Sequence, residues 1–279
     1  MAVIFALWMR NLRAFVRNRT ALIINLVFPF FFLFIFAEVF RIDNIENPVT
    51  FMLAGIIIAT VFDSSLRMAS STINDMTSGF MKEVLVSPIS RVTIAIGQFL
   101  AAATVATLQG MLIFAAGFAV GLRISSPLTV LWVILAMILV GLVFAGFGLF
   151  IATKAKNIQT FQSISLALTM PMSFISGAYI PFAMLPEPLV WVGRFNPLTY
   201  AVAFFRTIVL ERFDAPIDEL VLGELAIDIQ GFIISPMGAA GVLLIFGALF
   251  LVLSTHSFMR VDFSKMSRNA GDSMMEDVV

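Results

Sequence analysis

The chain has 279 residues, of which 60% are hydrophobic and 12% charged, and its formal net charge is zero. A soluble domain carries about 25% charged residues, and several apolar runs here reach the ~20 residues that cross a bilayer. The sequence therefore predicts an integral, polytopic, all-α membrane protein. The lack of cysteine excludes disulfides and thiolate metal sites, and the balanced charge argues against nucleic acid as a partner.

The first segment, residues 2–20, combines apolar and basic residues at helical spacing. Its apolar face carries Leu7 and Trp8. Its charged face carries Arg10, Arg13, Arg17 and Arg19. This pattern predicts an amphipathic helix in the membrane interface, with its arginines toward lipid headgroups. A helix docked on other parts of the protein is the alternative.

Six apolar runs predict six membrane spans. They cover residues 21–40, 51–71, 92–121, 128–153, 158–178 and 235–259, and a polar tail, 260–279, follows. We expect Pro29 to kink the first span and Pro171 to interrupt the fifth. In the fourth span, Gly141, Ala145 and Gly148 share one face, which favours close helix packing.

The second span is apolar in its first half and polar in its second. Asp63 and Arg67 are four residues apart, so they share a helix face and can pair. Charged groups inside a span are costly and usually face a cavity or another protein segment. The alternative is that the membrane ends near Asp63 and the helix continues into water.

The fifth span carries a stripe of polar residues at spacings of three or four. The stripe consists of Gln162, Ser165, Thr169, Ser173 and Ser176. Such a stripe either lines a pathway or forms hydrogen bonds between helices. We therefore name a candidate translocation pathway from spans two and five. Its residues are Phe62, Asp63, Leu66, Arg67, Gln162, Ser165, Thr169 and Ser173.

A short polar segment, residues 74–88, separates the second and third spans. It has helical spacing, with Phe80 and Val84 on one side and Lys82 and Glu83 among the polar residues. Pro88 ends it, because proline lacks a backbone donor and disfavours helix in the residue before it. From the residues alone, an ordinary solvated loop is the favoured interpretation.

Residues 179–234 are too apolar at first for a free loop and too rich in proline for one spanning helix. The interrupting prolines are Pro181, Pro186, Pro188 and Pro197. Two short helices that dip into the membrane and return fit this pattern, provided that protein covers their backbone. The part after Leu210 is more polar and acidic.

The distribution of basic residues predicts the orientation. Six spans put both termini on one side, and twelve basic residues fall there: Arg10, Arg13, Arg17, Arg19, Arg67, Lys82, Arg91, Lys154, Lys156, Arg260, Lys265 and Arg268. The other side has five: Arg41, Arg123, Arg194, Arg206 and Arg212. The positive-inside rule then places both termini and residues 74–91 in the cytoplasm, and residues 179–234 outside.

The sequence carries no signal of an enzyme. A G-x-x-x-x-G-K-[ST] loop, which would hold ATP, does not occur. The single histidine, His256, cannot form a specific catalytic or metal site, and Asp63 can be neutralised by Arg67. We therefore predict a protein with no catalytic residue, no metal and no cofactor of its own. If it moves a substrate, we expect the energy to come from elsewhere.

Over nearly its whole length the chain resembles the membrane subunit, or permease, of ABC-2-type ABC transporters, which have the type V exporter fold. The amphipathic N-terminal helix and the six-span layout contribute to the resemblance. One motif in the polar segment is similar to the family's pattern at Asp75, Gly79, Glu83, Leu85, Pro88, Arg91 and Gly97. A second matches at Ser176, Gly177, Ile180, Pro181, Pro186, Trp191, Asn196, Pro197, Leu198, Thr199, Tyr200 and Arg206.

The resemblance implies two permease subunits, identical or related, in a prokaryotic inner membrane. They would pair with two copies of a separate ATP-binding subunit, which holds ATP and Mg. Residues 74–88 would be the coupling helix, whose contact residues are Asp75, Gly79, Lys82, Glu83, Leu85, Ser87, Pro88 and Arg91. Re-entrant external helices would close an outer gate at Ser176, Gly177, Pro181, Asn196, Pro197, Tyr200 and Arg206. Spans two and five would rearrange at the dimer axis and expel substrate.

The composition gives one indication of the substrate. The chain has 30 Phe and 16 Met but only two Tyr and three Trp. Polysaccharide sites favour aromatic rings with a hydrogen-bonding edge, whereas Phe and Met suit adaptable apolar contacts. We therefore favour hydrophobic drug-like or lipid-like molecules over a polysaccharide or lipid-linked glycan. An ATP-independent channel or carrier, and an assembly factor without transport activity, are further alternatives.

Overall fold

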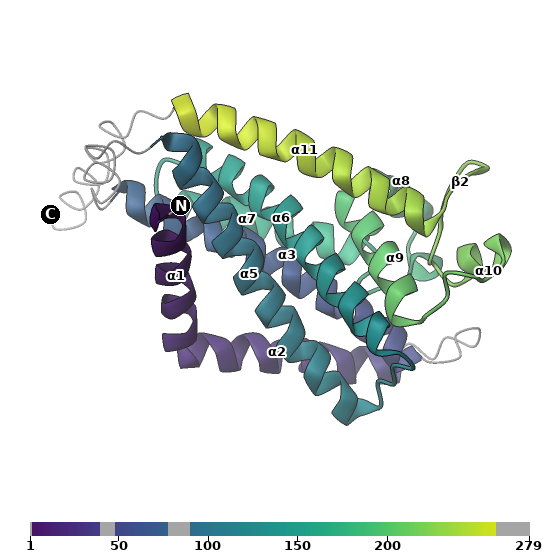
Figure 1. Cartoon of the computed structure of the whole chain (residues 1–279). Coiled ribbons are helices and arrows are strands. Elements are labelled where there is room, and N and C mark those ends of the chain that lie inside the picture. The colour runs from purple at the N-terminus through teal and green to yellow at the C-terminus, as the bar shows by residue number, and fades with distance from the viewer. Residues whose placement is uncertain (1, 40–47, 78–89, 261–279) are drawn as a thin grey trace, which may run out of the picture.

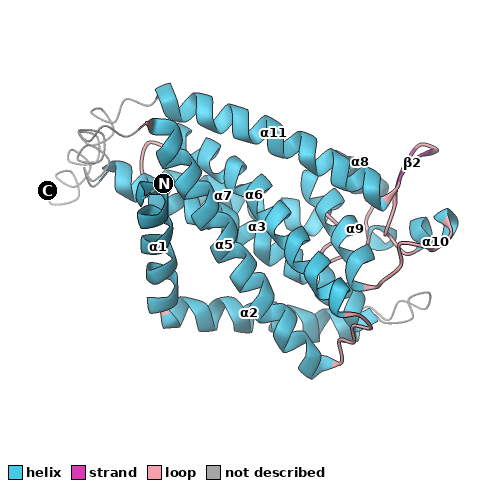
Figure 2. Ribbon diagram, in the orientation of Figure 1, coloured by secondary structure: helices cyan, strands magenta, loops and turns pink. Residues whose placement is uncertain are grey.

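The computed structural model describes residues 2–39, 48–77 and 90–260, and these ranges are predominantly helical (Figure 1). The long helices are α2 (Arg19–Val39), α3 (Pro48–Thr77), α5 (Arg91–Gly117), α6 (Pro127–Lys154), α7 (Ile158–Ile175) and α11 (Pro236–Arg260). They run back and forth between the two ends of one bundle. Figure 2 shows that loops and the short strands gather mainly at the end opposite α1 (Ala2–Arg17).

Four of the described helical segments are long and apolar enough to cross a membrane. They are Pro48–Asp75, Val92–Val120, Pro127–Lys154 and Pro236–Arg260. The bent pair α1–α2, with 68° between its parts, would add a fifth span. The predicted fifth span corresponds to the 18-residue α7, which carries the polar stripe and is not in this group. The chain is an integral membrane protein, and the total of six spans stays a prediction.

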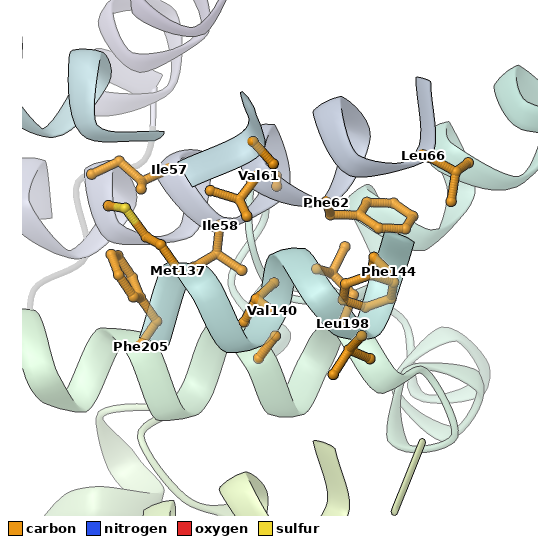
Figure 3. Packing of buried hydrophobic residues seen from close by; sticks show 14 of the residues in the cluster. Ile57, Ile58, Val61, Phe62, Leu66, Met137, Val140, Phe144, Leu198 and Phe205 are labelled. Atoms are coloured by element: carbon orange, nitrogen blue, oxygen red, sulfur yellow. The ribbon is translucent and has the colours of Figure 1, made fainter. Parts of the chain in front are cut away.

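α3 is the central helix of the bundle. It contacts α2, α5, α6, α7 and α9 (Pro197–Val209), and residues 51–62 are buried without exception. Phe62 packs edge-to-face on Phe144 of α6, with ring centroids 4.5 Å apart, and Leu66 lies beside them (Figure 3). Because lipid is as apolar as these side chains, close packing rather than escape from water stabilises the contact.

Small residues let the helices of this core approach closely. A Cβ added at Gly141 would lie 3.1 Å from Cα of Ala103 in α5. One added at Gly148 would lie 3.1 Å from Cα of Leu66 in α3. The predicted packing role of this face of α6 is therefore confirmed.

α1 is docked on the bundle through one face. Leu7 is buried against α5, and Trp8 Nε1 donates to Thr104 Oγ1 at 3.0 Å. Arg13 and Arg17 are exposed. The apolar face of α1 is therefore docked on the protein, as the alternative interpretation proposed. The position of its arginines in the membrane interface stays a prediction.

The segment between α7 and α11 contains short elements. They are the 3-10 turn Phe182–Met184, α8 (Glu187–Arg194), α9, α10 (Ile217–Leu222), β1 (Ile227–Ile229) and β2 (Phe232–Ile234). A further 3-10 turn, Phe118–Val120, extends α5. Two short helices in the apolar half agree with the sequence-based expectation. Their re-entrant placement stays a prediction.

Two local expectations were wrong. α7 continues through Pro171 to Ile175, so this proline does not interrupt the helix. The fold is also not entirely α, because β1 and β2 pair as an antiparallel hairpin with Ile227 opposite Ile234. Gln230 and Gly231 turn the hairpin with φ of 53° and 87°, the left-handed backbone that a two-residue hairpin loop requires.

Candidate functional site

A cavity of about 560 Å³ lies between α2, α3 and α7. Its α2 side is mainly apolar, with Ile24, Phe28, Pro29 and Phe32 and one polar residue, Asn25. The opposite side has apolar residues of α7, such as Phe161 and Phe174, and a polar stripe. The stripe consists of Thr60, Asp63, Arg67 and Ser70 of α3, Gln109 of α5, and Gln162, Ser165, Thr169 and Ser173 of α7. A site of this size suits a drug-sized molecule, and its two sides suit a molecule with one apolar and one polar face.

The structure brings most of the predicted pathway residues together. Asp63, Arg67, Gln162, Ser165, Thr169 and Ser173 line this one cavity. Phe62 and Leu66 do not, because they point toward α6 and are completely buried in the core (Figure 3). Apolar residues occupy several sides of α3 in this region, so they gave no indication of which side faces the cavity.

Asp63 and Arg67 form an ion pair on the cavity wall. Arg67 Nη2 lies 2.8 Å from Asp63 Oδ2, one helical turn away, which confirms the predicted pairing. The helix does not leave the bundle at Asp63, since Ser65, Leu66 and Ile73 beyond it are buried. The pair therefore faces a cavity and brings no net charge to it.

Two buried polar atoms of the cavity wall have no hydrogen-bond partner in the described part of the chain. They are Nε2 of Gln109 and Oγ of Ser165, whose residues are only 3% and 6% exposed. Gln109 was missed in the sequence analysis. The available signal was an amide within a mainly apolar span, because such a group usually faces protein or a cavity rather than lipid.

An aromatic group lies at the cavity edge where α7 ends. The ring of Tyr179 lies 5.3 Å from that of Phe32 on α2 and 5.3 Å from that of Phe174 on α7, centroid to centroid. All three residues line the cavity. They connect α2 to α7 at the end nearest the short helices.

Arg206 is the best-connected member of the predicted gate. The side chain is 1% exposed, donates from Nη2 to the carbonyl of Gly177 at 2.8 Å and from Nε to that of Phe51 at 3.3 Å. Its Nη1 lies 3.5 Å from Oε2 of Glu224, and its guanidinium lies 3.5 Å from the ring centroid of Phe51. Arg206 thus ties α9 to the start of α3 and the end of α7.

The other predicted gate residues hold the same region together. Asn196 caps α9 at the Leu198 amide and donates from Nδ2 to the carbonyl of Met172 at 2.7 Å. Tyr200 donates to the carbonyl of Arg194 at 2.6 Å. Ser176 Oγ accepts from the amide of Ala178 at 3.2 Å.

Backbone geometry accounts for the remaining gate residues. Gly177 has φ of 79°, which favours glycine. Pro197 is the first residue of α9, where its missing N–H costs nothing. Pro181 precedes the turn Phe182–Met184. The gating role itself stays a prediction.

Two acidic residues outside the spanning helices have shifted pKa values. Burial raises the pKa of Glu224, while Arg206 opposes this shift. Hydrogen bonds from Ser125 and Thr129 lower the pKa of Glu211, whose Oε1 lies 2.6 Å from Thr129 Oγ1. Glu211 thereby connects the end of α9 to the start of α6.

Most of the predicted coupling residues lie outside the described residues: Gly79, Lys82, Glu83, Leu85, Ser87 and Pro88. α5 begins at Arg91. Asp75, at the end of α3, forms an ion pair with Arg10 of α1 and accepts from Gln98 Nε2 of α5 at 3.3 Å. Gln98 Oε1 in turn accepts from Asn11 of α1 at 3.0 Å. Asp75 therefore joins three helices.

A helical membrane bundle with an internal two-faced cavity defines a membrane transport component. The sequence profile of the ABC-2 type transporter family matches residues 2–210. Because this match covers most of the chain, the protein belongs to the ABC-2 type transporter family. Membership of this family implies that the subunit works with an ATP-binding subunit.

Similar proteins include transport permeases. The chain is 27% identical over 195 residues to transport permease ycf38 of Cyanophora paradoxa, covering 67% of each chain. It is 28% identical over 225 residues to Nodulation protein J of Sinorhizobium fredii, covering 74% of this chain and 81% of the relative. Nodulation protein J of Rhizobium leguminosarum is 26% identical over 219 residues, with 74% and 81% covered.

Proposed function

We propose that this protein is the permease subunit of an ATP-driven exporter that moves hydrophobic, drug-like or lipid-like molecules out of the cytoplasm or inner leaflet. The observation that carries this proposal is the cavity between α2, α3 and α7, with its mainly apolar α2 side and the polar stripe of α3 and α7 opposite it. Four phenylalanines, Phe28, Phe32, Phe161 and Phe174, line it. They favour an apolar substrate over a polysaccharide or lipid-linked glycan.

The proposed assembly contains two permease subunits and two ATP-binding subunits in a prokaryotic inner membrane. ATP and Mg belong to the partner, and this chain contributes no catalytic residue. Six spans, α2, α3, α5, α6, α7 and α11, place both termini in the cytoplasm. α1 and the C-terminal end of α11 lie at the same end of the bundle (Figure 1), which supports this orientation.

Residues 74–88 are proposed to receive the displacement that ATP binding causes in the partner. The contacts of Asp75 support this role, because a push on the end of α3 is passed directly to α1 and α5. α8 and α9 are proposed to form the outer gate. Arg206 connects them to the external ends of α3 and α7, which line the cavity.

The test is ATP-dependent efflux of a hydrophobic dye from proteoliposomes that contain the permease and its ATP-binding subunit. Thr169→Trp places a large side chain in the cavity and is expected to lower the rate at least tenfold while the complex still assembles. Leu244→Trp, on an exposed position of α11, is the matched control and keeps the rate. Equal efflux in both variants would contradict the proposal, as would ATP-driven transport of a labelled polysaccharide only.

Coupling is tested with Glu83→Ala in the same complex. ATP hydrolysis is expected to continue while efflux falls, because the displacement is no longer passed on. Efflux that keeps pace with hydrolysis would contradict the coupling role of this segment.

A further inference from the structure

We infer that the ligand of the cavity is a neutral amphiphile that places one hydrogen-bonding group against Gln109 and Ser165 and its apolar body against α2. This inference rests on the proposed function, since it concerns the molecule that occupies the same cavity. It adds the ligand's charge and polarity, and it assigns a specificity role to Gln109 of α5.

The argument begins with the two unsatisfied polar atoms. A buried donor without a partner costs about 1–3 kcal/mol, and proteins rarely leave one. In the described part of the chain, Gln109 Nε2 and Ser165 Oγ are the buried side-chain atoms without a partner. They come from different helices, α5 and α7, yet both residues line the same cavity. A bound acceptor would satisfy them.

Three of the other polar residues of the wall, Thr60, Asp63 and Arg67, are engaged or balanced, and the rest are neutral: Asn25, Ser70, Gln162, Thr169, Ser173 and Tyr179. Thr60 Oγ1 donates to the carbonyl of Ile56 at 2.8 Å within its own helix. Asp63 and Arg67 neutralise each other at 2.8 Å. A charged ligand would have to compete with this pair or leave its own charge uncompensated, which is costly in a low-dielectric site. The wall therefore selects a ligand without net charge.

The α2 side determines the rest of the ligand. Apart from Asn25, the α2 side chains that line the cavity offer no hydrogen bond, so a hydroxyl placed against them would be unpaired, and this costs free energy. A bare glycan carries hydroxyls on every edge. An amphiphile carries its polar group on one side only, in agreement with the two-faced cavity of about 560 Å³.

The first experiment measures binding, without ATP, to the full chain in nanodiscs. The probes are a tritiated monoacylglycerol, the fatty acid anion with the same chain, and the matching alkyl trimethylammonium cation. We expect the neutral probe to bind at least tenfold more tightly than either charged probe. Equal or tighter binding of a charged probe would overturn the inference.

The second experiment uses variants that remove the unpaired groups. Gln109→Leu and Ser165→Ala are each expected to weaken monoacylglycerol binding about 3–10-fold, the effect of one lost neutral hydrogen bond. Without ligand, their unfolding temperature is expected to stay equal or rise, because an unsatisfied buried group has been removed. A residue with a purely structural role would show lower stability and unchanged affinity.

Matched controls separate these effects from general perturbation. Gln159→Leu changes an exposed glutamine of α7, and Ser254→Ala changes a buried serine of α11 that donates to Leu251. Both lie outside the cavity and are expected to keep wild-type affinity. Wild-type affinity in Gln109→Leu and Ser165→Ala as well would overturn the inference.

ATP-driven efflux of the monoacylglycerol is measured separately on the reconstituted complex. Selective binding without efflux would contradict the proposed export function and leave the assigned ligand chemistry standing. The opposite result is efflux of hydrophobic dyes together with tighter binding of the charged probes. It would agree with the export function and contradict the inference that the ligand is a neutral amphiphile.

Discussion

At the scale of single residues, Arg206 is a fully enclosed charge that stabilises the end of the bundle opposite α1. Replacing it by leucine leaves Glu224 buried without its cation and leaves the carbonyls of Phe51 and Gly177 without a donor. Breaking one partner of a buried pair costs about 3–5 kcal/mol. We therefore expect Arg206→Leu to lower the free energy of unfolding by about this amount, as measured by thermal denaturation in detergent.

Two further variants control this prediction. Arg206→Leu with Glu224→Leu is expected to recover part of the loss, because no unpaired charge remains. Arg212→Leu removes an exposed arginine 4.0 Å from Glu219 and is expected to cost less than ~1 kcal/mol. Equal losses for Arg206→Leu and Arg212→Leu would contradict the stabilising role of Arg206.

Glu211 makes one contact at this same end of the bundle dependent on pH. Its pKa is lowered from 4.5 by the hydrogen bonds from Ser125 and Thr129, so the folded protein favours the carboxylate. The contribution is complete above pH 4.5 and is lost as the pH falls through the lower folded value. We expect the Ser125 amide to exchange faster, after correction for intrinsic rates, in that acidic range. Glu211→Gln should remove this dependence, and an unchanged pH profile in the variant would argue against it.

The residues of the cavity were only partly predictable. The 3–4 spacing of α7 placed Gln162, Ser165 and Thr169 on one face, since helical geometry is local. Gln109 was missed because the surface that it faces comes from helices distant in sequence. Phe62 was assigned to the pathway together with Asp63, although neighbouring residues on a helix point in directions about 100° apart.

At the scale of elements, α3 and the segment that follows α7 approach each other closely at Gly55. A Cβ at Gly55 would overlap the backbone carbonyl of Ala178, which cannot move aside as a flexible side chain can. We expect Gly55→Ala to destabilise the protein by about 1–3 kcal/mol through overpacking. Gly241→Ala in α11, where a Cβ meets nothing within 4 Å, should stabilise by up to ~1 kcal/mol. Thermal unfolding of both variants measures the contrast, and destabilisation by both would contradict it.

Helix positions followed from the sequence more readily than the short external elements. Runs of about 20 apolar residues define spans through the thickness of the bilayer alone. β1 and β2 have three residues each, too few to show alternation, and their pairing depends on the turn at Gln230 and Gly231. Pro171 was expected to interrupt its helix, but neighbouring groups in a bundle can compensate for a missing backbone donor.

At the scale of the whole molecule, the proposed topology can be tested directly because the chain has no cysteine. Lys156→Cys lies between α6 and α7, and Leu222→Cys lies at the end of α10, and both positions are exposed. In intact cells a membrane-impermeant maleimide is expected to label Leu222→Cys only. Lys156→Cys should react after the membrane is permeabilised. Labelling of both variants from outside would contradict the orientation.

The ion pair of Asp63 and Arg67 has a consequence for the energetics of export. One elementary charge that crosses the membrane field exchanges about 2.3 kcal/mol per 100 mV. Because both charges belong to α3 and lie 2.8 Å apart, a movement of this part of the helix carries them together, and the pair displaces no net charge. Efflux of a neutral molecule should therefore proceed at the same rate at every membrane voltage, as proteoliposomes clamped with potassium and valinomycin would measure. An efflux rate that changed with voltage would show that α3 moves a net charge. A constant rate would mean that ATP alone can drive efflux in a cell whose membrane has lost its potential.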